Sequence, residues 1–244
     1  MSRPAPGEEF RFAYLIEPPF CYRAADGEVT GCDVEVARHV FRTLGYTSFV
    51  SVETEFADLL PGLEDGRWHM TTGMFVTPER ARRATFCRPV WALPDGLLVA
   101  GGNPHGITGY GSLAREPALR LGVVQDQMQH RTALDIGVPE ARIRIFANYP
   151  EAAAAVAGGV VDAYASVAMA HAGHLAEHPA SGLSIVEVPV SDKPAAVGAF
   201  AVPRAANDLR DAIDAALAGF LGSSEHRALM ARFGFSDAQV DLIA

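Results

Sequence analysis

The sequence predicts an α/β protein, and three observations support this fold class. Between about residues 120 and 189, short apolar segments of strand type alternate with segments of helical spacing, the order typical of a sheet covered by helices. Apolar residues make up 49% and charged residues 20% of the chain, as in globular proteins. A length of 244 residues is sufficient for two lobes with separate cores.

The N-terminal part is predicted to form a strand, a turn and a helix. Residues 10–16 alternate as a strand, and the prolines of Glu17-Pro18-Pro19-Phe20 end it because proline has no backbone N–H. From Val34 onward apolar residues recur at helical spacing. Asp33 is placed to cap this helix and Gly45 to end it.

Further elements are expected before residue 101. A second helix is predicted at 57–65, and a strand at 70–74. The sequence Thr77-Pro78-Glu79-Arg80 has a hydroxyl residue, a proline and an acid in the order typical of a helix start. We therefore expect a helix to begin just after Thr77.

A strand at 97–100 is followed by Gly101-Gly102-Asn103-Pro104, the first strong linker signal. The elements predicted after it are strands at 120–124, 142–146, 162–166, 184–189 and 197–202, helices near 128–135, 150–157, 168–177 and 208–221, and a final helical section that includes Phe233. The region after the linker is expected to form a second lobe.

Charge and histidine spacing argue against several classes of function. The formal net charge of −9 argues against a nucleic-acid partner, because binding of phosphates needs clustered basic residues. In the nearest approach to such a cluster, Arg80, Arg82, Arg83 and Arg88, the last three are expected to form a solvated helix face. His171 and His174 lie three apart but are expected on a solvated helix rather than in a metal site. No cofactor is expected.

The three cysteines leave one question open. Cys21 and Cys32 can pair in an oxidising compartment or remain packed free thiols, and their spacing with Cys87 matches no zinc or redox motif. Residues 1–9 carry no basic patch followed by an apolar stretch. Either export is absent or the chain begins after a removed signal.

Several ordered motifs then resemble one protein family. They are Pro19-Phe20-Cys21-Tyr22, Gly31-Cys32-Asp33-Val34-Glu35-Val36-Ala37, Leu59-Leu60-Pro61-Gly62-Leu63-Glu64-Asp65-Gly66-Arg67, Gly73-Met74-Phe75-Val76-Thr77-Pro78-Glu79-Arg80-Ala81, Leu209-Arg210-Asp211-Ala212 and Arg232-Phe233-Gly234-Phe235-Ser236. This set resembles the family 3 extracytoplasmic solute-binding proteins of bacterial ABC importers. The resemblance covers nearly the whole chain.

The resemblance implies a two-lobed, type II periplasmic-binding-protein fold with a hinge of two crossovers. Lobe 1 is expected at 1–101 plus 197–244, and lobe 2 at 102–196. The implied ligand lies in the cleft, where it stabilises the hinge-closed state. The expected partners are a small zwitterion and the membrane subunits of an ABC importer. We expect a non-enzymatic monomer in the periplasm or outside the cell, membrane-associated through the transporter.

The resemblance and local chemistry together suggest an anion clamp. Arg80 follows the cap residue Thr77, so its fork of donors and the backbone N–H groups of that turn converge on one spot. A ligand carboxylate suits this spot. Gly73 and Met74, from the same motif, are included among the ligand-binding residues.

Aromatic residues suggest the other half of the ligand. Phe75 stands where many amino-acid binders of the family carry a small hydroxyl residue, and a phenyl ring cannot accept a hydrogen bond from a primary ammonium in that way. Phe20 and Phe56 occupy loop positions that face the cleft in the family. The three rings are expected to form a partial box around a delocalised or alkylated cation, with Glu17 as the countercharge.

In lobe 2 the acid that pairs with an α-ammonium in the family is missing, and Ser166 replaces it after Gly159-Val160-Val161-Asp162-Ala163. The loop 125–129 has bulky residues in place of the usual small ones, so Gln127 and Met128 either narrow the cleft or reach the ligand. Their presence leaves the exact ligand open.

The whole set of site residues looks similar to that of ectoine and hydroxyectoine binders. A binder of polar or cationic amino acids remains the main alternative. Cyclohexadienyl dehydratases share the fold, but their chemistry needs a general acid, and only Glu17 and Asp126 are acids placed near the cleft. A sensory module working with a separate partner is the third class.

Overall fold

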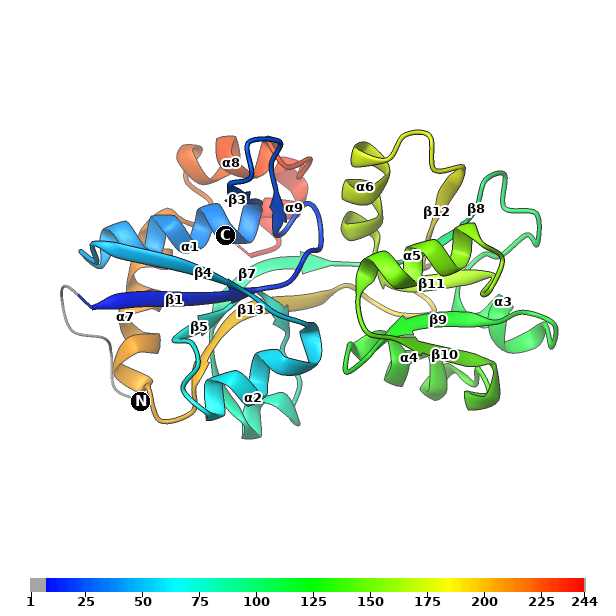
Figure 1. Cartoon of the computed structure of the whole chain (residues 1–244), viewed down its shortest axis with the longest axis horizontal. Coiled ribbons are helices and arrows are strands. Elements are labelled where there is room, and N and C mark those ends of the chain that lie inside the picture. Colours follow the sequence, from blue (N-terminus) through cyan, green and yellow to red (C-terminus); the bar gives the residue numbers. More distant parts are fainter. Residues whose placement is uncertain (1–7, 244) are drawn as a thin grey trace. The chain divides into compact units, whose positions relative to one another are not determined.

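The computed structural model describes residues 8–243. By its internal contacts the chain divides into two compact units. Unit 1 takes in the described residues up to Ala92 together with those from Ala196 onward, and unit 2 is Leu93–Ala195. The chain therefore passes from one unit to the other twice, and each unit has its own sheets and helices (Figure 1).

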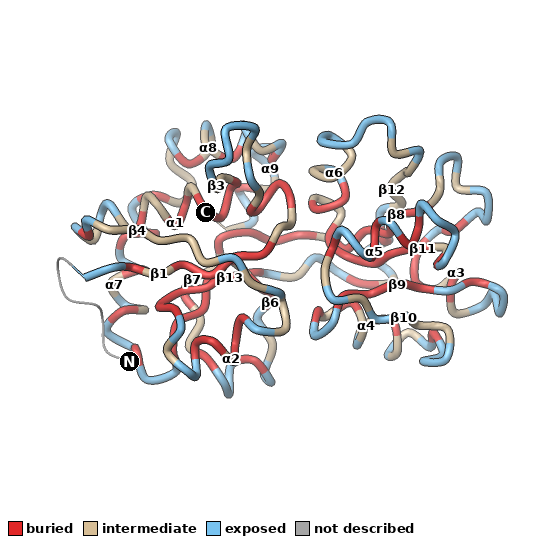
Figure 2. Tube along the Cα trace, in the orientation of Figure 1, coloured by how far each residue is buried: buried red, intermediate tan, exposed pale blue. Residues whose placement is uncertain are grey.

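Unit 1 contains two three-stranded sheets, ordered β4-β1-β5 and β6-β13-β7, and the two-stranded ladder β2-β3. Its strands are β1 (Glu9–Tyr14), β2 (Tyr22–Arg23), β3 (Val29–Thr30), β4 (Ser48–Glu53), β5 (Met70–Thr71), β6 (Met74–Phe75), β7 (Ala84–Leu93) and β13 (Ala196–Pro203). Its helices are α1 (Cys32–Thr43), α2 (Leu59–Glu64), α7 (Asn207–Phe220), α8 (Ser224–Ala231) and α9 (Asp237–Asp241), with 3-10 turns η1 (Phe56–Asp58) and η2 (Arg80–Arg82). Burial concentrates along β1, β7 and β13 (Figure 2).

Unit 2 is built on one five-stranded mixed sheet, ordered β10-β9-β11-β8-β12. Its elements are β8 (Asp95–Ala100), α3 (Tyr110–Arg115), β9 (Leu121–Val124), α4 (Met128–Ile136), the 3-10 turn η3 (Glu140–Arg142), β10 (Ile143–Phe146), α5 (Tyr149–Ala157), β11 (Ala163–Val167), α6 (Ala168–Glu177) and β12 (Leu183–Glu187). The α/β prediction is confirmed.

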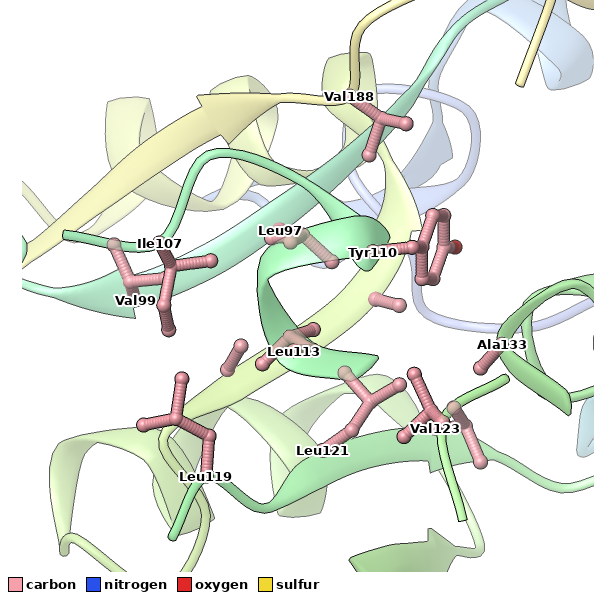
Figure 3. Packing of buried hydrophobic residues seen from close by; sticks show 13 residues of the cluster. Leu97, Val99, Ile107, Tyr110, Leu113, Leu119, Leu121, Val123, Ala133 and Val188 are labelled. Atoms are coloured by element: carbon pink, nitrogen blue, oxygen red, sulfur yellow. The ribbon is translucent and has the colours of Figure 1, made fainter. Parts of the chain in front are cut away.

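Alternation along the strands gives the sheet of unit 2 two buried faces. Leu97 and Val99 pack with Tyr110 and Leu113 of α3 in one apolar cluster (Figure 3). Ala165 of β11 belongs to the same cluster. The opposite face of β11 carries Tyr164 and Ser166 and is covered by α5 and α6.

The first crossover lies closer to the N-terminus than the Gly101-Gly102 linker suggests. β8 pairs antiparallel with both β11 and β12, so residues 95–100 belong to unit 2 rather than to lobe 1. The glycines are instead the turn that follows β8, and the backbone of Gly101 bonds to Gly182 beside β12. The return to unit 1, before Ala196, lies one residue from the predicted position.

The predicted strand at 70–74 is divided. Residues Met70–Thr71 pair with β1, whereas Met74–Phe75 pair with β13 in the other sheet. Gly73 stands between the two segments, and a Cβ atom there would lie 2.7 Å from the indole nitrogen of Trp91. Glycine therefore lets the chain pass this ring where it changes sheets.

Candidate ligand-binding site

The segment around Arg80 forms a cap bond but not the predicted helix. The backbone N–H of Arg80 donates to the Thr77 hydroxyl over 3.2 Å, as a cap residue requires. Only the 3-10 turn η2 follows, and the chain then enters β7. The β-branched and aromatic residues of Ala84–Leu93 favour a strand, and pairing with β13 outweighs the local helix signal.

The guanidinium of Arg80 is held by two neighbours from different elements. Its Nη1 donates to the carbonyl of Phe75 over 2.9 Å, and its Cζ lies 5.0 Å from the centre of the Phe56 ring. The residue is only 8% exposed. An arginine buried in this way is fixed in direction, because both a hydrogen bond and a cation–π contact orient its planar group.

The three aromatic rings predicted for the site, Phe20, Phe56 and Phe75, have different contacts within unit 1. Phe20 and Phe75 are each 5% exposed and both contact the indole of Trp91, at centroid distances of 5.5 and 5.4 Å. Phe56 is half-buried and supports Arg80 instead. Arg80 in turn bonds the carbonyl of Phe75. These contacts join Phe56, Arg80, Phe75, Trp91 and Phe20 in one chain of contacts within unit 1.

Glu17 lies at the start of a tight backbone turn that also fixes Phe20. The carbonyl of Glu17 accepts from the Phe20 N–H over 3.0 Å, and its N–H donates to the Cys21 carbonyl over 2.8 Å. The position of Glu17 is therefore set relative to one of the rings. Its role as a countercharge stays a prediction.

The structure decides between the two states that the sequence allows for the cysteines. Cys21, Cys32 and Cys87 are all buried free thiols. The Cys21 Sγ atom lies 3.3 Å from the Thr72 hydroxyl. Burial is the main reason that the pKa of both Cys21 and Cys32 lies well above its usual value, so these groups remain neutral and unreactive.

Asp33 does not cap α1 as predicted. The N-cap is Gly31, and the Asp33 side chain is 2% exposed inside unit 1. Its Oδ2 accepts from the Thr72 hydroxyl over 2.6 Å and from the Gly73 N–H over 2.7 Å, while Oδ1 accepts from the Trp91 indole over 3.2 Å. Desolvation raises the pKa of Asp33 to about 6, and these hydrogen bonds lower it in part.

A signal for the burial of Asp33 is present in the sequence. Asp33, Val36, Ala37 and Val40 recur at the spacing i, i+3, i+4 and i+7, and all four are buried on one face of α1. An acid on the apolar stripe of a helix needs buried hydrogen-bond donors. Trp91, also absent from the predicted site, supplies one of them from β7.

The predicted residues of unit 2 lie at the ends of two strands. Gln127 is the N-cap residue of α4 and is buried, Met128 opens that helix, and Ser166 is buried near the end of β11. Asp126, just before them, has a left-handed backbone with φ of 61°. Contact of these residues with a ligand stays a prediction.

The expectation that His171 and His174 lie on a solvated helix face is wrong for His171. His171 is fully buried, and its ring nitrogens lie 2.7 Å from the Tyr149 hydroxyl and 3.2 Å from the Gly96 carbonyl. The ring of His174 stacks on His178 at 4.4 Å. Among residues 8–243, no group of three or more His, Cys, Asp or Glu side chains is arranged to hold a metal ion. In the same range no helix is long and apolar enough to span a membrane.

Comparison with known proteins identifies the family. Residues 11–236 match the model of the bacterial extracellular solute-binding proteins, family 3. A protein of Sinorhizobium fredii (strain NBRC 101917 / NGR234), described as the probable amino-acid ABC transporter periplasmic-binding protein y4tE, is 33% identical over 229 residues, which cover 91% of this chain and 76% of that protein.

Two solved structures share the fold. EhuB in complex with hydroxyectoine has a TM-score of 0.87 and 27% identity, covering 96% of this chain and 91% of that chain. The ancestral amino acid-binding protein AncCDT-1, a precursor of cyclohexadienyl dehydratase, has a TM-score of 0.79 at 22% identity, covering 92% of this chain and 94% of that chain. The fold is the type II periplasmic-binding-protein fold, and the chain belongs to the family 3 bacterial extracellular solute-binding proteins.

Proposed function

We propose that this protein is the solute-binding component of an ABC importer and captures a small zwitterion with a delocalised or alkylated cation, such as ectoine or hydroxyectoine. The observation that carries this proposal is a series of contacts in unit 1. Arg80 contacts Phe56 and Phe75, and Trp91 connects Phe75 to Phe20. It combines a fixed anion-binding group with apolar rings in one unit.

The carboxylate of the ligand is assigned to Arg80. A guanidinium recognises a carboxylate through parallel N–H donors, and its hydrogen bonds to an ionised partner are stronger than those between neutral groups. Because Phe75 and Phe56 hold the arginine in direction, little side-chain entropy is lost when an anion binds.

The cation of the ligand is assigned to the rings and to Glu17. Ectoine is a cyclic amidinium carboxylate, whose planar cation suits aromatic faces and whose N–H groups suit a glutamate. The strand of unit 2 that carries Ser166 has no acidic residue between Ala163 and Val167, so it offers no carboxylate to a primary ammonium. Similarity to a protein solved with hydroxyectoine supports the same ligand class.

The first alternative is an ordinary polar amino acid. The description of the Sinorhizobium relative as a probable amino-acid ABC transporter periplasmic-binding protein favours an amino acid, without naming its kind. The second is an enzyme, because AncCDT-1 is a precursor of a dehydratase. Its 22% identity supports likeness of fold alone. Absence of product after incubation with prephenate or arogenate is the result expected of a binding protein.

Location and partners follow from the proposed role. We place the protein in the periplasm or outside the cell as a monomer that meets the membrane subunits of its importer. Capture by closure of the two lobes stays a prediction, and a ligand-dependent decrease in the radius of gyration measured by small-angle X-ray scattering tests it.

A thermal-shift panel tests the ligand class. Ectoine and hydroxyectoine are expected to raise the melting temperature in proportion to the logarithm of concentration, because they bind the native state only. The panel includes glycine betaine, proline and the polar and basic L-amino acids. A response only to ordinary L-amino acids contradicts the assignment of the rings.

Phe75→Ser provides the internal control of this panel. Loss of one aromatic face should weaken ectoine binding about tenfold without unfolding the protein. The serine hydroxyl should at the same time improve the relative response to amino acids with a primary ammonium. An unchanged order of ligands in Phe75→Ser removes Phe75 from the proposed site.

A further inference from the structure

The buried carboxylate of Asp33 lies between the chain segments that carry Phe20 and Phe75, the two rings that contact Trp91. Asp33 accepts hydrogen bonds from the Thr72 hydroxyl, the Gly73 N–H and the Trp91 indole, and a weaker one from the adjacent Cys32 thiol over 3.9 Å. Thr72 and Gly73 directly precede β6, which carries Phe75. The carboxylate therefore fixes the chain just ahead of Phe75 and the indole against which that ring packs.

Asp33 also fixes the segment of the other ring. Its backbone N–H donates to the carbonyl of Phe20 over 3.1 Å. Gly31, with φ of 127°, allows this approach, because a Cβ atom there would lie 2.1 Å from the same Phe20 oxygen. The start of α1 and the loop of Phe20 are thus closely packed, and Asp33 bonds to both ring-bearing segments.

Trp91 is the shared support of the two rings. Its indole meets Phe75 edge-on, with an interplanar angle of 80°, and Phe20 at a tilt of 46°. Gly198, which pairs with Phe75 across β13 and β6, leaves the space for the indole, since a Cβ atom there would lie 2.0 Å from the ring. The hydrogen bond to Asp33 then sets the direction of the indole within this space.

We propose that Asp33 and Trp91 are positioning residues for ligand selectivity: they hold Phe20 and Phe75 at the separation and tilt that suit a planar or alkylated cation. This inference rests on the proposed function, since it assigns the two rings to the ligand. Neither residue needs to touch the ligand. The hydrogen bonds of Asp33 act on the rings through the backbone and through Trp91.

A carboxylate is needed at position 33, and its amide is not an equivalent. The Gly73 N–H donates to one oxygen of Asp33 and the Trp91 indole N–H to the other, and neither of these two groups can accept a hydrogen bond. In Asp33→Asn, the amide NH₂ must replace one oxygen and face either the indole N–H or the Thr72 and Gly73 donors. In either orientation of the amide, the Gly73 N–H or the Trp91 indole N–H loses its hydrogen bond to residue 33.

The chain offers a matched control for Trp91. It contains two tryptophans, and Trp68 is also buried and also donates its indole N–H, to the Leu59 carbonyl over 3.0 Å. Trp68 packs in the core cluster of α2, which includes Leu59, Leu63 and Met74 and against which Phe56 packs. Trp68→Phe therefore removes the same hydrogen-bonding group from a site of similar burial without touching Phe20 or Phe75.

The experiment compares Trp91→Phe, Trp68→Phe and Asp33→Asn by calorimetric titration with ectoine and with L-arginine, beside their melting temperatures. Trp91→Phe should weaken ectoine binding about tenfold and lower the ratio of ectoine affinity to L-arginine affinity. Asp33→Asn should change the ratio in the same direction. Trp68→Phe should change the melting temperature and leave the ratio at the wild-type value. A wild-type ratio in Trp91→Phe overturns the inference.

A ligand-free measurement separates this inference from the proposed function. With ¹⁵N-labelled tryptophan, the two indole N–H signals are assigned from the two Trp→Phe variants. Asp33→Asn should shift the Trp91 signal and leave the Trp68 signal in place, and an unmoved Trp91 signal contradicts the positioning role. If the wild type binds only ordinary L-amino acids, the proposed ligand is wrong. Trp91→Phe is then compared with Trp68→Phe on the amino acid that binds, and equal losses of affinity overturn the inference.

Discussion

At the scale of single residues, Arg80 is the group on which the proposed ligand assignment depends most. It is buried and held between the Phe75 carbonyl and the Phe56 ring, in the turn capped by Thr77. Burial of a cation costs free energy that its neighbours must offset. An arginine kept in such a position is more consistent with recognition of an anion than with a solvated ion pair.

Arg80→Ala is predicted to weaken ectoine binding by about 100-fold or more, because a lost charge-assisted hydrogen bond costs about 1.5–3 kcal/mol and a carboxylate uses two such bonds. Calorimetric titration measures the loss. Arg82→Ala is the control, since Arg82 lies in the same 3-10 turn and is exposed. Arg80→Lys keeps the charge but not the fork, and should bind at least about tenfold more weakly than wild type. Full affinity in Arg80→Ala would remove the carboxylate assignment.

The contrast between Arg80 and Asp33 shows what sequence alone can predict at this scale. The cap signal places Arg80 correctly next to Thr77, because that hydrogen bond spans three residues. Asp33 has partners at positions 72, 73 and 91, and no local pattern shows where these distant donors lie. Its assignment as a helix cap fails for this reason. The apolar stripe around it is the one local sign that it is buried.

At the scale of elements, hydrophobic periodicity predicts α1, α2, α4, α5, α6 and α7 close to their observed bounds, along with the strands of unit 2. It does not predict α3, a short helix after the linker, or the long strand β7. The 3-10 turn and β7 replace the helix expected after Thr77, because strand pairing in the sheet of β13 is a tertiary effect.

Two helical glycines are predicted to respond to alanine with opposite signs. Gly62 in α2 has no space, because a Cβ atom would lie 1.9 Å from the buried Trp68 ring, so Gly62→Ala should lower the free energy of unfolding by about 2 kcal/mol or more. Gly219 in α7 has nothing within 4 Å, so Gly219→Ala should raise it by about 0.5–1 kcal/mol. Urea unfolding measures both, and changes of the same sign would contradict the packing described for α2.

His171 of α6 contacts Tyr149 of α5, and its burial predicts that the free energy of unfolding depends on pH. Desolvation lowers the pKa of His171 to about 3, so the folded state keeps the ring neutral while the unfolded chain protonates it near pH 6.5. The stability that His171 contributes is therefore present above about pH 6.5 and is lost as the pH falls toward 3.

His171→Gln removes this titration and allows it to be measured. Relative to wild type, its free energy of unfolding should be lower at pH 7, because the ring packs against Tyr149 and Tyr164. Its decline between pH 6.5 and 4.5 should be shallower, by up to about 1.4 kcal/mol per pH unit. Parallel pH profiles for the two proteins would show that His171 does not titrate as described.

At the scale of the whole molecule, the chain passes between the units twice, and one buried ion pair joins the two passages inside unit 2. Lys193, the only lysine of the sequence, donates to Asp95 over 2.6 Å. Asp95 lies just after the first passage and Lys193 just before the second. Tyr110 and Gln129 also donate to the Asp95 carboxylate, which is fully buried.

Lys193→Met is predicted to destabilise unit 2 by about 3–5 kcal/mol, because it leaves a buried carboxylate without its cation. Adding Asp95→Asn should recover part of this loss, since the buried charge is then removed as well. Urea unfolding of the two single variants and the double variant gives the coupling free energy. Strictly additive effects would mean that Asp95 and Lys193 do not act as a pair.

The family, the fold class and the course of the chain through two units can be predicted from sequence, since they depend on motifs distributed along the whole chain. The position of the first passage between the units cannot be predicted from sequence. Gly101-Gly102 signals a turn after β8, but this signal does not show to which unit β8 belongs. The pairing of β8 with β11 and β12 assigns β8 to unit 2.

Calorimetric titration of the wild-type protein with ectoine tests whether the protein binds this class of ligand. We expect saturable binding with one ligand per chain, tighter than that of L-arginine, L-glutamine or any other ordinary L-amino acid tested. Binding restricted to amino acids with a primary α-ammonium, with no heat change on addition of ectoine or hydroxyectoine, would contradict it.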